Sequence, residues 1–227
     1  MIEVYGGDHG MGGQSPEAMG EASLIINPHL LSAQGYAFFR PDMPQTGAEP
    51  AASLVRAAET AADALVASGL VDPARIGVMG QSYGGYTALC VLTGSKRFKA
   101  GIVANGVYDL FRADTDEVPQ SIAFVEAGQG RMGASLWEKP QRYLDNSPLH
   151  LLDRLQAPLL VLQGDADFIS MRQGPALFAS LRRLGKTAEY MSGAGMDHVP
   201  TSWSVEIQRE LVPALLKFLD TQVKAKP

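Results

Sequence analysis

The sequence contains little cysteine and no long apolar run. One cysteine among 227 residues permits no internal disulfide, which is typical of a reducing compartment such as the cytoplasm. No apolar stretch approaches the ~18 residues that cross a membrane, and Met1 is not followed by a charged and then an apolar segment. We therefore expect a cytoplasmic protein that has neither a membrane-spanning helix nor a secretion signal.

Clusters of positive charge are absent as well. The chain carries 19 Lys and Arg against 24 Asp and Glu, which gives a formal net charge of −5. Because the binding of nucleic acid depends largely on clustered positive charge, we expect no nucleic-acid partner. Hydrophobic residues make up 46% of the chain, and its length suits one globular domain over residues 1–227.

Short apolar runs alternate with helical patterns along the chain. Strands are predicted over residues 2–5, 36–43, 75–79, 100–108, 157–164 and 188–193. Helices are predicted over residues 22–35, 49–69, 83–93, 174–185 and 203–224. Residues 111–147 contain proline and glycine turns and are predicted to form an irregular, lid-like insertion. The alternation predicts an α/β fold with a mostly parallel sheet, helices on both faces and a site beyond the carboxyl ends of the strands.

The segment Gly-Gln-Ser-Tyr-Gly at residues 80–84 lies between a predicted strand and a predicted helix. In that context the G-x-S-x-G pattern is typical of a nucleophile elbow, where small neighbours let the strand and helix close around a strained serine. The N-terminus of the helix adds positive partial charge beside the serine oxygen. Taken alone, the pattern also fits a glycine-rich turn that cradles a phosphate, so Ser82 needs partners elsewhere in the chain.

A serine hydroxyl becomes an effective nucleophile when a histidine accepts its proton and an acid orients that histidine. In α/β-hydrolases the chain order is serine, acid, histidine. Asp165 and Asp167 follow the predicted strand 157–164, and only one of the four histidines, His198, comes after them. The order predicts a triad of Ser82, Asp167 and His198, with Asp165 as the alternative acid.

Two further histidines and the cysteine receive simpler interpretations. His29 lies in a helical pattern and is predicted to be a packing or surface residue. His150 is predicted to be a helix-start or surface residue. Cys90 lies in the predicted helix 83–93 and is expected to be buried as a packing residue rather than to be reactive.

Acyl transfer also requires hydrogen-bond donors aimed at the developing oxyanion. The backbone N–H of Tyr83, directly after Ser82, is the predicted first donor. The second donor should come from the loop after the first predicted strand. A backbone N–H in that loop and the phenol of Tyr5 both remain open as this donor.

Four segments together resemble the catalytic domain of the prolyl oligopeptidase family of serine peptidases. They are VYGG (4–7), GQSYGGY (80–86), SPLHLLDRLQAPLLVLQGDAD (147–167) and GAGMDHVP (193–200). Residues 38–50 and the helix that follows look most like the glutamyl endopeptidase-type branch. The resemblance implies an α/β-hydrolase fold, cleavage of peptide bonds through an acyl-enzyme, and no metal or organic cofactor.

The resemblance also implies roles for individual residues. Tyr5 matches the family tyrosine whose hydroxyl completes the oxyanion hole. The G-x-x-D pattern counted from Gly164 places the acid at Asp167. Several members hold a substrate carbonyl with an Arg or Asn two residues after this acid, and that position is Ile169 here. Ile169 is therefore a candidate substrate-binding residue by position, although its side chain has no hydrogen-bond donor for a carbonyl.

Residues 105–137 are further candidates for lining an acyl pocket, with core packing as the alternative for each aromatic side chain. The candidates are Asn105, Tyr108, Phe111, Phe124 and Trp137.

Compared with the family, we expect this chain to lack an N-terminal β-propeller and the first strands of a full hydrolase sheet. We expect an exposed sheet edge, covered either by a missing N-terminal part of a longer peptidase or by a partner subunit in a homo-oligomer. The leading hypothesis is a serine peptidase. A carboxylesterase that acts on small esters with the same triad and a catalytically inert truncated fragment are the alternatives.

Overall fold

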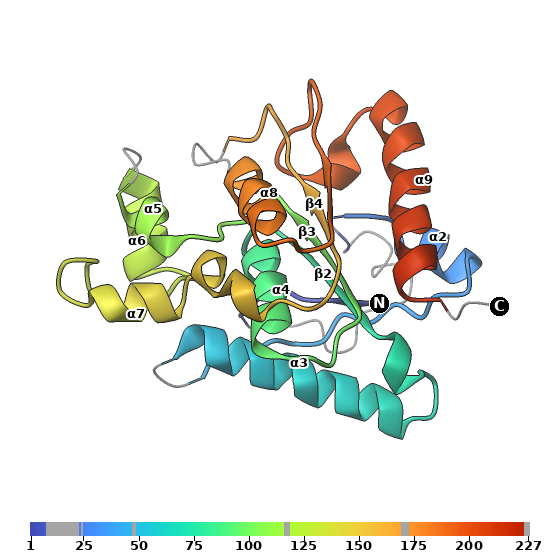
Figure 1. The fold of residues 1–227 in the computed structure, drawn as a ribbon, viewed down its shortest axis with the longest axis horizontal. Helices are drawn as coiled ribbons and strands as arrows, with labels where there is room; N and C mark the ends of the chain where they lie inside the picture. Colours follow the sequence, from blue (N-terminus) through green and yellow to red (C-terminus); the bar gives the residue numbers. More distant parts are fainter. Residues whose placement is uncertain (8–22, 24, 47–48, 116–118, 169–172, 225–227) are drawn as a thin grey trace.

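The computed structural model describes residues 1–7, 23, 25–46, 49–115, 119–168 and 173–224. Five parallel strands form a sheet in the order β1-β2-β3-β4-β5. Figure 1 shows β2, β3 and β4 at the centre of the molecule. The strands are β1 (Ile2–Glu3), β2 (Gly77–Gln81), β3 (Ala100–Ala104), β4 (Leu159–Leu162) and β5 (Ala188–Met191). All five were predicted. The central strands β2, β3 and β4 are fully buried, and buried parallel strands read as short, nearly continuous apolar runs.

The connections between the strands are helical. The α-helices are α2 (Pro28–Ala33), α3 (Pro50–Ala67), α4 (Tyr83–Gly94), α5 (Leu110–Asp114), α6 (Pro119–Glu126), α7 (Pro140–Asp145), α8 (Gly174–Arg183) and α9 (Val205–Gln222). Short 3-10 helices are η1 (Pro73–Arg75), η2 (Pro148–Arg154) and η3 (Pro200–Ser202). Within the described ranges, no helix is long and apolar enough to cross a membrane.

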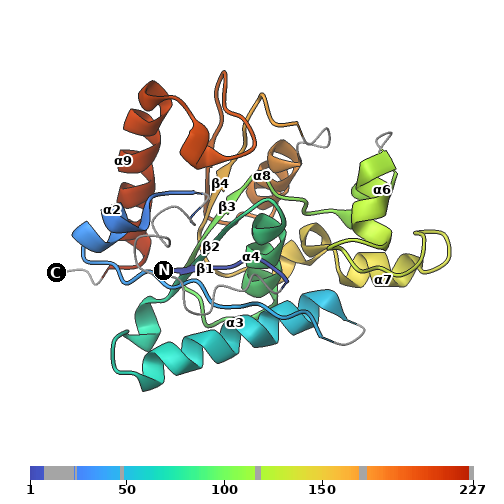
Figure 2. The same ribbon diagram turned by 180° about the vertical axis from the view of Figure 1, so that it is seen from behind.

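Two hydrophobic cores lie on opposite faces of the sheet. Alternate residues of β2 contribute to different cores, with Val78 in one and Met79 in the other. The first core takes side chains from α3, α4 and α8, and the second from α2 and α9. Figure 2 shows α2 and α9 on the side of the sheet away from α4 and α8. This arrangement confirms the predicted α/β-hydrolase architecture of a parallel sheet with helices on both faces.

The predicted helix over 22–35 is shorter than expected. Among the described residues of this range, only Pro28–Ala33 is helical, and the side chain of Asn27 caps it by accepting a hydrogen bond from His29 N at 2.9 Å. The residue before a proline avoids helical backbone angles, so the helix begins at Pro28. Ile25 and Ile26 are buried in the second core without being helical.

The predicted strand over 36–43 is wrong as a regular strand, although this segment runs beside β1. It makes two isolated bridges, Ile2 with Phe39 and Gly7 with Met43. Glu3 N donates to Phe39 O at 2.9 Å, and Phe39 N donates to Met1 O at 3.0 Å. The outer side of β1 is therefore partly paired by this segment, which corrects the expectation of an exposed edge there.

Residues 111–147 are not irregular as predicted, because they include most of α5, all of α6 and all of α7. Pro119 and Pro140 each stand at the first position of a helix, where a proline is well tolerated because its missing N–H would be unpaired. The prolines were interpreted as turn residues, but here they mark helix starts. Figures 1 and 2 both place these three helices to one side of the sheet.

Candidate active site

Ser82 lies on a sharp corner between β2 and α4. Its backbone φ is 57° and its ψ is −123°, a conformation that is rare for a residue with a side chain. Neighbouring glycines permit this corner, since a Cβ atom on Gly80 would lie 2.1 Å from Gly84 O. A Cβ atom on Gly84 would lie 2.5 Å from Val4 O. The local backbone thus has the tight strand-to-helix turn that the G-x-S-x-G pattern predicted.

The loops after β4 and β5 bring an acid and a histidine together. His198 Nδ1 lies 2.8 Å from Asp167 Oδ1. Because a carboxylate oxygen accepts hydrogen bonds, this contact assigns the proton to Nδ1 and leaves Nε2 able to accept a proton. Figure 1 shows both loops rising at the same end of the sheet.

The two candidate acids differ in their surroundings. Asp165 is exposed, whereas Asp167 is 9% exposed and contacts the imidazole. Gln163 Nε2 donates a second hydrogen bond to Asp167 Oδ2 at 3.1 Å. The structure therefore favours Asp167 over Asp165 as the partner of His198.

A side-chain amide connects the serine corner to the histidine loop. Gln81 Nε2, one residue before Ser82, donates to His198 O at 2.6 Å. Within the described part of the chain, no hydrogen bond joins the Ser82 side chain to His198. In unliganded enzymes this contact is often long and shortens when substrate binds.

Both candidate oxyanion donors lie beside the serine corner. Tyr83 is the first residue of α4, where a backbone N–H has no partner within the helix. Its ring is 1% exposed and stacks on Tyr86, and burial raises the pKa of its phenol. Tyr5 lies two residues after the end of β1 and is half-buried. Its ring centroid is 6.1 Å from that of Tyr83. A Cβ atom on Gly84 would lie 3.0 Å from the Tyr5 ring, so the missing side chain leaves room for this tyrosine.

The sequence of this domain matches a family model over nearly its whole length. Residues 17–226 match the model of the prolyl oligopeptidase family. The chain belongs to this family. The assignment agrees with the resemblance seen in the sequence motifs, and it accounts for the parallel sheet and the serine corner together.

Individual members of the prolyl oligopeptidase family are distant in sequence. An uncharacterized peptidase, YuxL, of Bacillus subtilis is 25% identical over 215 residues, which are 87% of this chain and 30% of that protein. A probable chloroplastic glutamyl endopeptidase of Oryza sativa is 29% identical over 115 residues, 50% of this chain and 11% of that protein. This chain therefore spans about 30% of the length of the first of these relatives.

Solved structures of the family share the fold. Porphyromonas gingivalis dipeptidyl peptidase 4 superposes with a TM-score of 0.74 at 24% identity, covering 97% of this chain and 31% of that one. A puromycin-hydrolyzing peptidase of Mycobacterium tuberculosis superposes with a TM-score of 0.62 at 29% identity, covering 77% of this chain and 26% of that one. The match to a glutamyl endopeptidase covers only half of the chain, so membership of that branch stays a prediction.

Two predicted pocket residues lie beneath the surface. Asn105 is 1% exposed and its side chain bonds to other protein groups. Tyr108 is 0% exposed, and its hydroxyl accepts a hydrogen bond from Gly106 N at 3.2 Å. Both side chains are bonded to protein groups, and a substrate contact for either residue stays a prediction. The third candidate, Ile169, lies outside the described residues.

The aromatic candidates behave differently from one another. Phe124 is half-buried with its ring centroid 5.7 Å from that of Tyr83, close to the serine corner. The ring of Phe111 packs against that of Tyr143, with the two centroids 6.0 Å apart. Trp137 is 76% exposed, so it is not the core residue that the alternative interpretation expected.

The sequence reasoning missed Phe168, which lies directly after Asp167. Its side chain is 78% exposed, and its ring centroid is 4.4 Å from that of His198. No pattern in the sequence distinguishes Phe168 from an ordinary exposed loop residue. Its contact with His198 is visible only in the folded chain.

The other histidines lie away from this arrangement. His29 is exposed on α2, as predicted for a packing or surface residue. His150 is exposed in η2, with Nε2 3.3 Å from Asp109 Oδ1. Within the described ranges, no group of three or more His, Cys, Asp or Glu side chains is placed to hold a metal ion.

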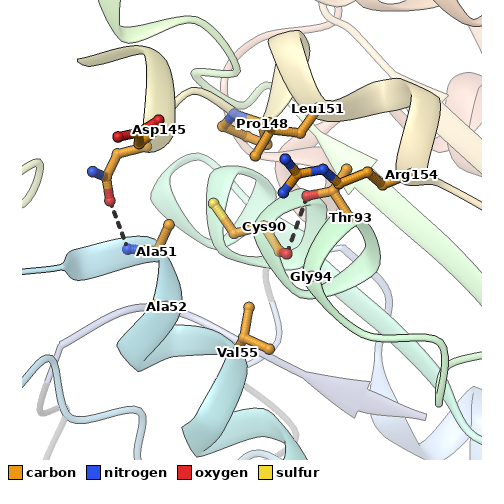
Figure 3. A pocket seen from close by; sticks show the side chains of 11 residues that line it. Ala51, Ala52, Val55, Cys90, Thr93, Gly94, Asp145, Pro148, Leu151 and Arg154 are labelled. Atoms are coloured by element: carbon orange, nitrogen blue, oxygen red, sulfur yellow. Dashed lines mark hydrogen bonds between the residues drawn. The ribbon is translucent and has the colours of Figure 1, made fainter. Parts of the chain in front are cut away.

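Cys90 lines a pocket of about 160 Å³ among α3, α4, α7 and η2 (Figure 3). None of the three candidate catalytic residues is among its lining residues. Cys90 is 3% exposed, and burial raises the pKa of its thiol to about 12. The neutral thiol therefore stabilises the fold at pH values below about 8.5, and this contribution is lost as the pH rises through the folded value of about 12.

We expect Cys90 to remain unmodified when the native protein is treated with iodoacetamide at pH 8. The thiolate is the reactive form, and both its burial and its raised pKa suppress it. Intact-mass spectrometry would follow the reaction, with the urea-unfolded chain as the control that becomes fully alkylated. Alkylation of the native protein at the rate of the unfolded control would contradict a buried, protonated thiol.

Proposed function

We propose that this chain carries the catalytic centre of a serine peptidase that cleaves peptide bonds through an acyl-enzyme. The observation that carries the proposal is the 2.8 Å contact of His198 Nδ1 with Asp167 Oδ1, in a loop whose backbone is bonded to the residue before Ser82. Membership of the prolyl oligopeptidase family supports the same chemistry. Relatives named as peptidases support a peptide as the substrate class.

In the proposed first half-reaction, Ser82 Oγ attacks the carbonyl carbon while His198 Nε2 accepts the hydroxyl proton. Asp167 holds the imidazole in the correct tautomer and stabilises the imidazolium that forms. The carbonyl oxygen becomes an oxyanion, which accepts hydrogen bonds from Tyr83 N–H and the Tyr5 hydroxyl. When the carbon–nitrogen bond breaks, His198 transfers its proton to the leaving amine.

In the second half-reaction, a water molecule takes the place of the leaving amine. His198 Nε2 accepts a proton from this water as its oxygen attacks the acyl carbon. The bond to Ser82 Oγ then breaks, and the proton returns to this oxygen. The chemistry requires no metal or organic cofactor. A cytoplasmic location stays part of the proposal, because a single cysteine permits no internal disulfide.

Labelling with a fluorophosphonate probe tests this proposal directly. An activated serine forms a covalent adduct with the probe, so we expect one adduct on the native protein and its location on the peptide that contains Ser82. Intact-mass and peptide-mass spectrometry would measure both. The Ser82→Ala variant and heat-unfolded wild type are the controls, and neither should be labelled.

The outcomes separate the three candidate functions. Labelling together with cleavage of peptide amides supports a peptidase. Labelling with hydrolysis of small esters alone would replace the proposal with a carboxylesterase. No adduct on a folded wild-type protein would overturn catalytic activity in this chain and favour an inert fragment.

A further inference from the structure

Asn105 lies at the end of β3, beneath the candidate active site. Its side chain is 1% exposed, and its φ of 47° falls in the left-handed region, which Asn tolerates better than most residues. Its backbone N–H donates to Leu162 O at 3.0 Å, at the end of the neighbouring strand β4. The residue is thus held between the loops that follow two adjacent strands.

The side-chain amide of Asn105 joins the acid loop to the histidine loop. On the acid side, its Oδ1 accepts hydrogen bonds from Gly164 N at 2.7 Å and from Gln163 Nε2 at 3.1 Å. On the histidine side, its Nδ2 donates to His198 O at 2.8 Å and to Asp197 O at 3.0 Å. Both N–H donors and both acceptor positions of the Asn105 amide are therefore occupied by groups of these two loops.

Two glutamines extend these contacts to the proposed catalytic residues. Gln163 Nε2 bonds to both Asn105 Oδ1 and Asp167 Oδ2, each at 3.1 Å. Gln163 Oε1 is itself fixed by Gly174 N at 3.0 Å. Gln81 Nε2 reaches the same carbonyl of His198 that Asn105 Nδ2 reaches, at 2.6 Å. The serine corner, the acid and the histidine are all attached to one buried group of amides.

We propose that Asn105 is a positioning residue that sets the distance between Asp167 and His198. It touches neither substrate nor the reacting atoms, and it acts by fixing the carbonyl of His198 relative to the loop that carries Asp167. This positioning role replaces the role in substrate binding that the sequence suggested for Asn105. The inference rests on the proposed function, since it assigns a purpose to the contact between the acid and the histidine.

The variant that tests the inference is Asn105→Asp. An aspartate keeps the size of the side chain and its acceptor for Gly164 N, but when ionised it cannot donate to His198 O or Asp197 O. The histidine loop should shift while the acid loop stays attached. Because a misplacement of about 1 Å costs about 100-fold in rate, we expect labelling of Ser82 by fluorophosphonate to slow by about 100-fold.

Asn146→Asp is the matched control. Asn146 is also 1% exposed, with Nδ2 donating to Arg142 O at 2.9 Å and Oδ1 accepting from Ala51 N at 3.0 Å. It lies at the pocket of Figure 3, which contains none of the proposed catalytic residues. The control should lose stability as Asn105→Asp does, but it should keep the wild-type labelling rate.

A spectroscopic readout makes the test independent of activity. The proton on His198 Nδ1 that is bonded to Asp167 should give a low-field proton NMR signal, assigned by its loss in His198→Gln. We expect this signal to disappear in Asn105→Asp and to remain in Asn146→Asp. If Asn105→Asp fails to fold, Asn105→Gly removes the same amide, suits the φ of 47°, and should give the same losses.

The possible results distinguish the inference from the proposed function. If the wild type is not labelled, and its NMR signal disappears in Asn105→Asp, the positioning role is supported and the proposed hydrolase activity is overturned. Labelling of wild type and Asn105→Asp at equal rates, with the signal kept, would overturn the positioning role alone. Absence of the signal in wild type would also overturn it, because the contact that Asn105 is proposed to set would be missing.

Discussion

Replacement of Asp167 by Asn is expected to lower kcat/KM by about 10⁴-fold, the size of effect seen when the acid of a serine triad is amidated. The carboxylate accepts the Nδ1 proton of His198 at 2.8 Å. An amide at the same position can donate to Nδ1 instead, which moves the imidazole proton to Nε2, where it blocks removal of the serine proton. Steady-state cleavage of a chromogenic peptide amide by wild type and variant would measure the loss.

Asp165→Asn is the control for this experiment. Asp165 lies two residues earlier in the same loop and is exposed, so the same chemical change should leave kcat/KM close to that of wild type. Thermal unfolding of both variants would show that neither result comes from loss of the fold. A large loss in Asp165→Asn with little effect in Asp167→Asn would reverse the assignment of the acid.

Replacement of Gly80 by Ala is expected to destabilise the protein by about 3 kcal/mol or more, because overpacking at a rigid site is costly. The new Cβ atom would lie 2.1 Å from Gly84 O and 2.8 Å from Val4 O, and both are backbone atoms. Neither oxygen can move unless α4, or the chain just after β1, separates from β2. Urea unfolding, followed by circular dichroism, would measure the change in the free energy of unfolding.

Gly193→Ala is the matched glycine variant. Its Cβ atom would meet only Met196, with Cε at 3.1 Å and Sδ at 3.7 Å, and a methionine side chain can rotate away. We expect the free energy of unfolding to change by less than about 1 kcal/mol. Equal losses in the two variants would show that the close backbone contacts at Gly80 do not exist in solution.

Most of the sheet was predictable from the order of residues along the chain. The central strands β2, β3 and β4 are buried throughout, so they read as short apolar runs such as "LLVL" at 159–162. The start of α2 and the helices α6 and α7 were missed or misplaced. Their prolines stand at first helical positions, and local sequence does not distinguish such a proline from one in a turn.

The candidate site was predictable in outline because of a property of parallel sheets. Loops after successive strands emerge at the same edge, so a serine, an acid and a histidine in such loops are brought close regardless of their separation in sequence. Chain order alone therefore proposed Ser82, Asp167 and His198. The family resemblance also placed the acid at Asp167 rather than at the alternative Asp165, and in the folded chain Asp167 contacts the imidazole.

Contacts that depend on loop conformation were decided only by the tertiary structure. Asn105 appeared as a pocket residue because it follows a strand, yet its positive φ turns its amide inward to four partners from other loops. The bridges of Phe39 and Met43 with Ile2 and Gly7 likewise depend on where the chain runs after it leaves the sheet. Strand positions and chain order are local properties that apolar periodicity records, whereas the direction of a side chain on a loop is set by backbone angles and by partners distant in sequence.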